Sequence, residues 1–285
     1  MNAAPRIAVF GAILVAAMAI GASMGATVGP DATKTEATTP PPMGQGVVAT
    51  RDGYRLVPDS PELSSDGGTF RFKIVDRDGQ PATQFTPVHE RDLHLIVVNR
   101  EMTNYHHVHP TLAVDGTWTI ELPALPPGSY RAIADFQIEG GPRLALGTDV
   151  SVAGDYTPTV LPEPHRTTQV DGYDITLNTE TGNGGEVTAS LTVTRNGRPV
   201  DDLEPYLGAN GHLVAIRAGD LAYAHVHPVD DHTGPPSDGT VVFDASLDAT
   251  GRYGLFFDFQ HHGIVHTAAF TFDQGSVTGA ADMGH

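Results

Sequence analysis

The chain has 285 residues, of which 40% are hydrophobic, and this length is sufficient for two domains of ordinary size. Its formal net charge of −18, with only 16 lysines and arginines, argues against nucleic-acid binding, which depends on neutralising phosphates. The chain contains no cysteine, which excludes disulfides, iron–sulfur clusters, thiolate zinc sites and blue copper sites. Any bound metal must therefore be held by imidazole, carboxylate or thioether groups.

The N-terminal segment, residues 1–30, predicts a hydrophobic helix that serves as a signal peptide or a membrane anchor. Arg6 is followed by an apolar stretch without charge until Asp31. Residues 7–20 match the apolar region of a signal peptide, and the stretch that continues to Val28 is long enough to span a bilayer. Both alternatives stay open. In both, the single flanking Arg6 leaves the rest of the chain outside the cytoplasm, anchored in the membrane or secreted.

The remainder of the chain has the pattern of short strands. No segment has a sustained helical period, and the 32 glycines and 22 prolines favour frequent turns. We therefore predict an all-β fold of two tandem immunoglobulin-like or cupredoxin-like antiparallel β-sandwich domains. The expected parts are a disordered Thr/Pro-rich tether at 31–46, domain 1 at 47–153, a linker at 154–166, domain 2 at 167–274 and a disordered tail at 275–285.

One segment occurs twice. The sequence HLIVVNREMTNYHHVHP at residues 94–110 returns as HLVAIRAGDLAYAHVHP at residues 212–228, with seven identical positions and a constant offset of 118 residues. Repeated units of this length indicate two similar domains. Each copy is typical of a β-hairpin, because an apolar run is followed by a polar connection and by a second strand that ends at proline.

The histidines of each hairpin are candidate metal ligands. His107 and His109 are two residues apart in a strand and therefore share a face. With a two-residue turn at Glu101 and Met102, His94 lies opposite His109 on that face, whereas a slip of one residue would remove it. The predicted ligands are His94, His107 and His109 in the first copy and His212, His225 and His227 in the second. The alternative is that these histidines have a packing role and that duplication has copied them.

Further candidates lie near the two hairpins. Asp135 and Asp258 alternate with core aromatics, so they are either solvated residues or additional ligands or acceptors that orient a ligand histidine. His261 and His266 have no counterpart in the first domain, and we expect them to complete a metal shell in the second, which makes it the better candidate. His106 is expected on the face opposite to His107, at the outer surface.

The paired HLxxV…YxHVHP segments and the GxYRxxADFQ segment resemble a group of secreted or membrane-anchored actinobacterial proteins, over about residues 47–272. The resemblance implies metal handling in the envelope, most often of copper, and supports the six hairpin histidines as ligands. Bacterial copper chaperones of cupredoxin-like fold combine methionine with histidine, and such methionines are absent here. Cu(II) or Zn(II) is therefore favoured over Cu(I).

These observations lead to three functional hypotheses. The first is an extracytoplasmic metal-binding protein that sequesters or delivers copper, or alternatively zinc, with the ion and an envelope metal transporter as partners. The second is an extracellular interaction module whose histidines are structural. The third is a three-histidine metal hydrolase, which we do not expect, because no general base stands out and the sequence contains no G-x-S-x-G or H-E-x-x-H motif.

Overall fold

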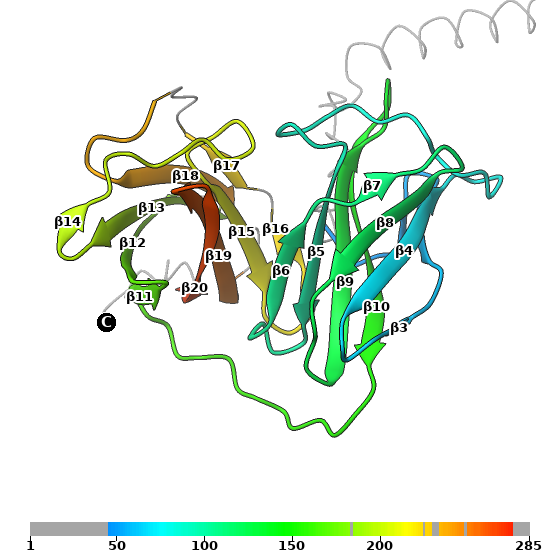
Figure 1. The fold of residues 1–285 in the computed structure, drawn as a ribbon, viewed down its shortest axis with the longest axis horizontal. Coiled ribbons are helices and arrows are strands. Elements are labelled where there is room, and N and C mark those ends of the chain that lie inside the picture. Colours follow the sequence, from blue (N-terminus) through cyan, green and yellow to red (C-terminus); the bar gives the residue numbers. More distant parts are fainter. Residues whose placement is uncertain (1–44, 183–184, 225, 230–233, 248–249, 276–285) are drawn as a thin grey trace, which may run out of the picture. The chain divides into compact units, whose positions relative to one another are not determined.

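The computed structural model describes residues 45–182, 185–224, 226–229, 234–247 and 250–275. These residues form twenty β-strands and no α-helix (Figure 1), which confirms the all-β fold predicted from the sequence. The expected N-terminal helix, most of the tether and nearly all of the tail lie outside the described residues. Within them, no helix is long and apolar enough to cross a membrane.

The first sandwich consists of two five-stranded sheets, with the strand orders β1-β2-β4-β8-β7 and β3-β10-β9-β5-β6. Its strands are β1 (Thr50–Arg51), β2 (Tyr54–Pro58), β3 (Glu62–Leu63), β4 (Gly68–Val75), β5 (Leu93–Asn99), β6 (Tyr105–Val108), β7 (Thr111–Leu112), β8 (Thr117–Leu122), β9 (Gly128–Gln137) and β10 (Arg143–Val152). The short strand β3 pairs in parallel with β10, which departs from the predicted antiparallel arrangement.

The second sandwich repeats this design. One sheet has the order β11-β12-β13-β18-β17, with β14 beside β13, and the other has the order β16-β15-β19-β20. Its strands are β11 (Thr167–Val170), β12 (Tyr173–Thr181), β13 (Glu186–Arg195), β14 (Arg198–Pro199), β15 (His212–Arg217), β16 (Tyr223–Ala224), β17 (Val226–Pro228), β18 (Thr240–Ser246), β19 (Gly251–His261) and β20 (Ile264–Gln274). An extended connection joins β10 to β11 (Figure 1).

Each sandwich has its own aromatic core. Trp118 and Phe72 are fully buried in the first, and Phe243 and Phe257 are fully buried in the second. These side chains alternate along their strands with residues of the opposite sheet face, as expected for the two-residue period of a strand. The alternation leaves one face of β5, β9, β15 and β19 directed away from these cores.

A third apolar cluster covers these outer faces and draws on both repeats. The first repeat contributes Ile96, Val98, Met102, Ile133 and Ala145, and the second contributes Val214, Ile216, Leu221 and Phe256. The rings of Tyr105 and Phe256 stack across it with their centroids 3.9 Å apart. Since every residue of β5 is buried, this strand packs on both of its faces.

The β5–β6 hairpin has the register predicted from the sequence. Leu95 pairs with Val108, so in this register the next two opposed residues are His94 and His109, which share a face. On its other side, β5 pairs with β9, and His94 lies opposite Asp135. The register therefore directs the histidines away from the core of the first sandwich.

The connection between β5 and β6 is longer than the predicted two-residue turn. The Asn99 N–H donates to the Asn104 carbonyl at 3.0 Å, and Met102 has a left-handed φ of 56°. The Asn99 side-chain oxygen also accepts hydrogen bonds from the Thr103 and Asn104 N–H groups, both at 2.8 Å. These bonds to the asparagine let a wider loop keep the same register.

The second hairpin follows the first for only two residue pairs. Ala215 pairs with Ala224 and Ile216 with Tyr223, which is the equivalent register. The following strand β17 then pairs with β18 in the other sheet, so that the His227 backbone lies opposite Asp244. The expectation of a continuous hairpin in both repeats is therefore wrong for the second, because β17 finds its hydrogen-bond partner in β18.

Candidate metal centre

Three predicted ligands of the first repeat converge. His94 Nδ1 lies 3.0 Å from His107 Nε2 and 3.2 Å from His109 Nε2. One nitrogen from each of the three rings lies within 4.8 Å of the others, and no other such group of ligand side chains occurs among the described residues. The ring centroids are 5.2, 4.9 and 5.0 Å apart, which forms a nearly regular triangle.

Two imidazoles of this cluster, those of His94 and His109, favour the neutral form that a metal requires. Burial, followed by the neighbouring His107, lowers the pKa of His94 to about 4. Burial, followed by the neighbouring His107 and His94, lowers the pKa of His109 to about 2. Since only a neutral imidazole offers a lone pair to a metal, both rings are competent ligands at neutral pH.

Two acceptors determine which nitrogens carry hydrogen. The Val88 carbonyl can only accept, so His94 donates to it from Nε2 at 2.9 Å and leaves Nδ1 with a lone pair. The Asp258 carboxylate accepts from His107 Nδ1 at 2.8 Å, which leaves the lone pair on His107 Nε2. In the neutral form of His107, the two nitrogens that face each other at 3.0 Å both have lone pairs, which repel each other. A cation between them relieves this repulsion.

Asp135 and Asp258 both face away from the core aromatics, as predicted, but neither is a solvated surface residue. Asp135 is 3% exposed and pairs with Arg143 at 3.0 Å, and it accepts a hydrogen bond from the Tyr223 hydroxyl at 3.1 Å. Asp258 is 2% exposed, and the partners described for it are His107 and the Thr267 hydroxyl. The interpretation as an acceptor that orients a ligand histidine fits Asp258, whose partner His107 belongs to the other repeat.

The second predicted ligand set is only partly described. His212 lies opposite Asp258, and its ring centroid is 6.3 Å from those of both His94 and His107. His225 lies outside the described residues, and of His227 only the backbone is described. The three-histidine group that the structure describes therefore belongs to the first repeat, whereas the sequence favoured the second.

His261 and His266 do not join His212. Both lie on the face of the β19–β20 layer that packs into the core of the second sandwich, opposite to the face of His212 and Asp258. His261 contacts the Tyr173 hydroxyl at 2.7 Å and an Asp202 oxygen at 2.9 Å, and His266 contacts an Asp171 oxygen at 2.7 Å. Successive residues of β19 point to opposite faces, so His261 and Asp258 lie on opposite faces of the sheet. The expected metal shell therefore does not form there.

Sequence reasoning missed two contributors to the cluster. His89, on the loop before β5, lies with its ring centroid 5.1 Å from that of His212 and 6.2 Å from that of His94. Tyr206 accepts a hydrogen bond from His212 Nε2 at its carbonyl, at 3.0 Å. His89 lies outside the repeated segment, so the repeat contained no signal for it. His106 lies on the face opposite to His107, as predicted, but it is half-buried.

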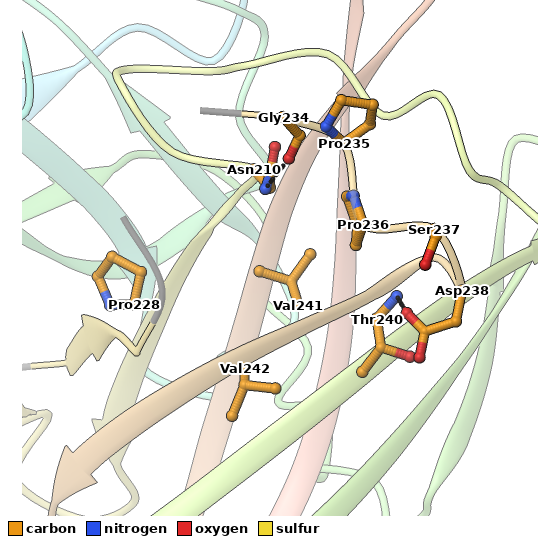
Figure 2. Close-up of a pocket in the computed structure, with 10 residues that line it drawn as sticks. All are labelled: Asn210, Pro228, Gly234, Pro235, Pro236, Ser237, Asp238, Thr240, Val241 and Val242. Carbon is orange, nitrogen blue, oxygen red and sulfur yellow. Dashed lines mark hydrogen bonds between the residues drawn. The ribbon is translucent and has the colours of Figure 1, made fainter. Parts of the chain in front are cut away.

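Two hollows are relevant to ligand access. A groove of about 680 Å³ is lined by His107, His109 and Trp118 and opens beside the cluster. A separate cleft of about 610 Å³ is lined by Pro235, Pro236 and other small residues with the single carboxylate of Asp238 (Figure 2). The cleft in Figure 2 has no group of ligand side chains among its lining residues, so the groove beside the histidines is the better candidate for metal entry.

Solved structures match this chain with low sequence identity and low TM-scores. They include a tandem-repeat segment of a large adhesion protein (16% identity, 77% of this chain, TM-score 0.26), the integrin-binding protein invasin (14%, 77%, 0.22) and a conserved domain protein from Bacillus anthracis (6%, 82%, 0.28). This chain covers 49%, 39% and 91% of those chains, respectively. At these TM-scores the likeness says nothing about function.

Among curated proteins, none matches this chain. One family model matches it twice, at residues 49–154 and 168–276, and these two segments make up most of the sequence. The double match confirms that the chain contains a duplicated domain. The chain therefore belongs to the DUF8832 family, a domain family of unknown function, of which it contains two copies.

Proposed function

We propose that this protein binds a divalent metal ion, copper or zinc, through His94, His107 and His109. The observation that carries the proposal is the convergence of three imidazole nitrogens, with His94 Nδ1 3.0 Å from His107 Nε2 and 3.2 Å from His109 Nε2. Val88 and Asp258 hold the rings of His94 and His107 with their hydrogens pointing outward. Carbonyl and carboxylate acceptors behind ligand histidines are the usual outer partners of a metal site.

The distances suit an ion of this kind. Metal–nitrogen bonds of about 2.0–2.1 Å place the nitrogens of a tetrahedral site about 3.3 Å apart and those of a square-planar site slightly closer together. The separations of 3.0 and 3.2 Å at His94 Nδ1 lie in this range. The buried Asp258 carboxylate, for which no lysine or arginine partner is described, adds a negative charge that favours a cation nearby.

Imidazole ligands suit both copper and zinc, and the intrinsic affinity order of divalent ions favours copper. The N-terminal segment and the tether are expected to place the site outside the cytoplasm, where the protein would sequester the ion or deliver it to an envelope transporter. No cysteine competes for the ion, so the histidines set the preference of the site.

Calorimetric titration of the region after residue 44 with Cu(II) and with Zn(II) tests the proposal. We expect saturation near one equivalent, and loss of binding in His107→Ala. The matched control is His106→Ala, which removes the neighbouring imidazole on the opposite face of the same strand and should bind normally. Equal affinity and stoichiometry in the wild type and His107→Ala would refute the proposal.

The second candidate function is a protein-interaction module in which the histidines only pack. It is favoured by the partners that several of these rings find within the protein, such as the Val88 carbonyl for His94. In that case the titration gives no specific uptake, while His107→Ala still lowers the free energy of unfolding, because Asp258 loses its buried partner.

A further inference from the structure

We infer that His212 supplies a further ligand to this site, so that one ion joins the two repeats. The inference rests on the proposed function, and it replaces the expectation of an independent site in each repeat by a shared one. His212 is 8% exposed and lies on β15 of the second repeat.

A hydrogen bond orients the ring of His212 for metal binding in the same way as that of His94. Each donates from Nε2 to the carbonyl of the residue six positions earlier: His94 to Val88 at 2.9 Å and His212 to Tyr206 at 3.0 Å. The Nδ1 atom of His212 therefore has the lone pair, as it does in His94.

The distances place His212 just beyond the three-histidine triangle. Rings that share a tetrahedral ion through imidazole nitrogens have centroids about 5 Å apart, judged from metal–nitrogen bonds of about 2.0–2.1 Å. The His212 centroid is 6.3 Å from those of His94 and His107, so a side-chain adjustment of about 1 Å is required. The ring centroid of His89 lies 6.2 Å from that of His94 and 5.1 Å from that of His212, so His89 lies beside His212 at the edge of the site.

The site already depends on both repeats. Asp258, which orients His107, belongs to the second repeat, and the shared apolar cluster around Ile96 and Phe256 lies beside it. A ligand from β15 would therefore add to an existing interface. Binding of the ion would then stabilise both repeats together, because it joins side chains that both repeats hold in place.

The test uses Co(II) and Zn(II) with the region after residue 44, comparing the wild type with His212→Gln, His107→Ala and the control His106→Ala. Glutamine keeps an N–H donor for the Tyr206 carbonyl and limits loss of stability, which circular dichroism and urea unfolding check. We expect His212→Gln to bind the ion about tenfold more weakly or worse, by analogy with the loss of orienting groups. We also expect its Co(II) visible bands to shift.

The outcomes separate the two proposals. If His107→Ala abolishes binding while His212→Gln binds as tightly as the wild type with an unchanged Co(II) spectrum, the site exists and the role of His212 is refuted. If neither variant alters binding, the metal site itself is refuted. Binding of two independent equivalents of metal, one of which is lost in His212→Gln, would also overturn the shared site. Each repeat would then have a metal site of its own.

Discussion

Asp258 connects the two repeats at a single side chain. Its carboxylate is buried and accepts a hydrogen bond from His107, and this bond keeps the lone pair of His107 on Nε2. The sequence predicted that Asp258 faces away from the core aromatics but not that its partner is in the other repeat, because a repeat pattern contains no information on how its copies pack.

Asp258→Asn is therefore expected to weaken metal binding by about 10–100-fold, the usual effect of losing an orienting partner. The amide keeps the size of the side chain but is a weaker acceptor than a carboxylate, so the ring of His107 is held less firmly. Calorimetry measures the affinity, with the exposed Asp273→Asn as the control. An affinity within twofold of the wild type would contradict this role of Asp258.

The buried histidines also predict how stability depends on pH. The pKa of His94 is about 4 in the folded protein and that of His212 is about 3, in both cases chiefly because of burial, against an ordinary value of 6.5. Above pH 6.5 both rings are neutral in the folded and unfolded states and have no effect. Between pH 6.5 and about 4, the unfolded chain takes up protons that the folded protein does not.

The free energy of unfolding of the metal-free protein should therefore fall as the pH drops from 7 to 5. Urea unfolding at the two pH values measures this change, and His94→Gln should show a smaller fall than the wild type. If the variant and the wild type lose the same stability over this interval, His94 is not neutral in the folded protein.

At the level of elements, the β5–β6 hairpin was predictable because its apolar run and its His-x-His pattern allow only one register that gathers the three imidazoles. The length of the loop was not predictable, since it depends on the hydrogen bonds that Asn99 makes to the loop backbone. A side chain of this kind can close several loop lengths.

The second hairpin shows why a repeated segment does not guarantee an identical structure. Tyr223 pairs with β15 as its counterpart Tyr105 pairs with β5, but β17 then pairs with β18. The choice between two available strand edges depends on residues distant in sequence, such as Phe243 opposite Pro228, and local alternation does not encode it.

At the level of the whole molecule, composition and turn spacing were sufficient to predict two all-β sandwiches. The shared apolar cluster was not predicted, although β5 contained a signal for it: its residues are apolar on both faces at Leu95, Ile96, Val97 and Val98. Strands buried on both faces have such continuous apolar runs, whereas strands with one solvated face alternate.

This cluster predicts that the two repeats unfold in one cooperative transition. Ile216→Ala removes a fully buried side chain and should cost about 2–5 kcal/mol, lowering the stability of both repeats together. Differential scanning calorimetry provides the measurement, and Ile264→Ala, at a side chain that is 59% exposed, is the matched control. Two separate unfolding transitions, only one of which shifts in temperature in Ile216→Ala, would contradict this coupling.

The extended connection between β10 and β11 has a consequence for dilute conditions. Two separate single-repeat molecules would cover their apolar faces only above the concentration at which they associate. A covalent connection replaces that encounter by an internal one, with a local concentration on the order of millimolar. The fraction of molecules with an assembled interface is then independent of abundance, so a scarce protein would retain its full binding capacity per molecule.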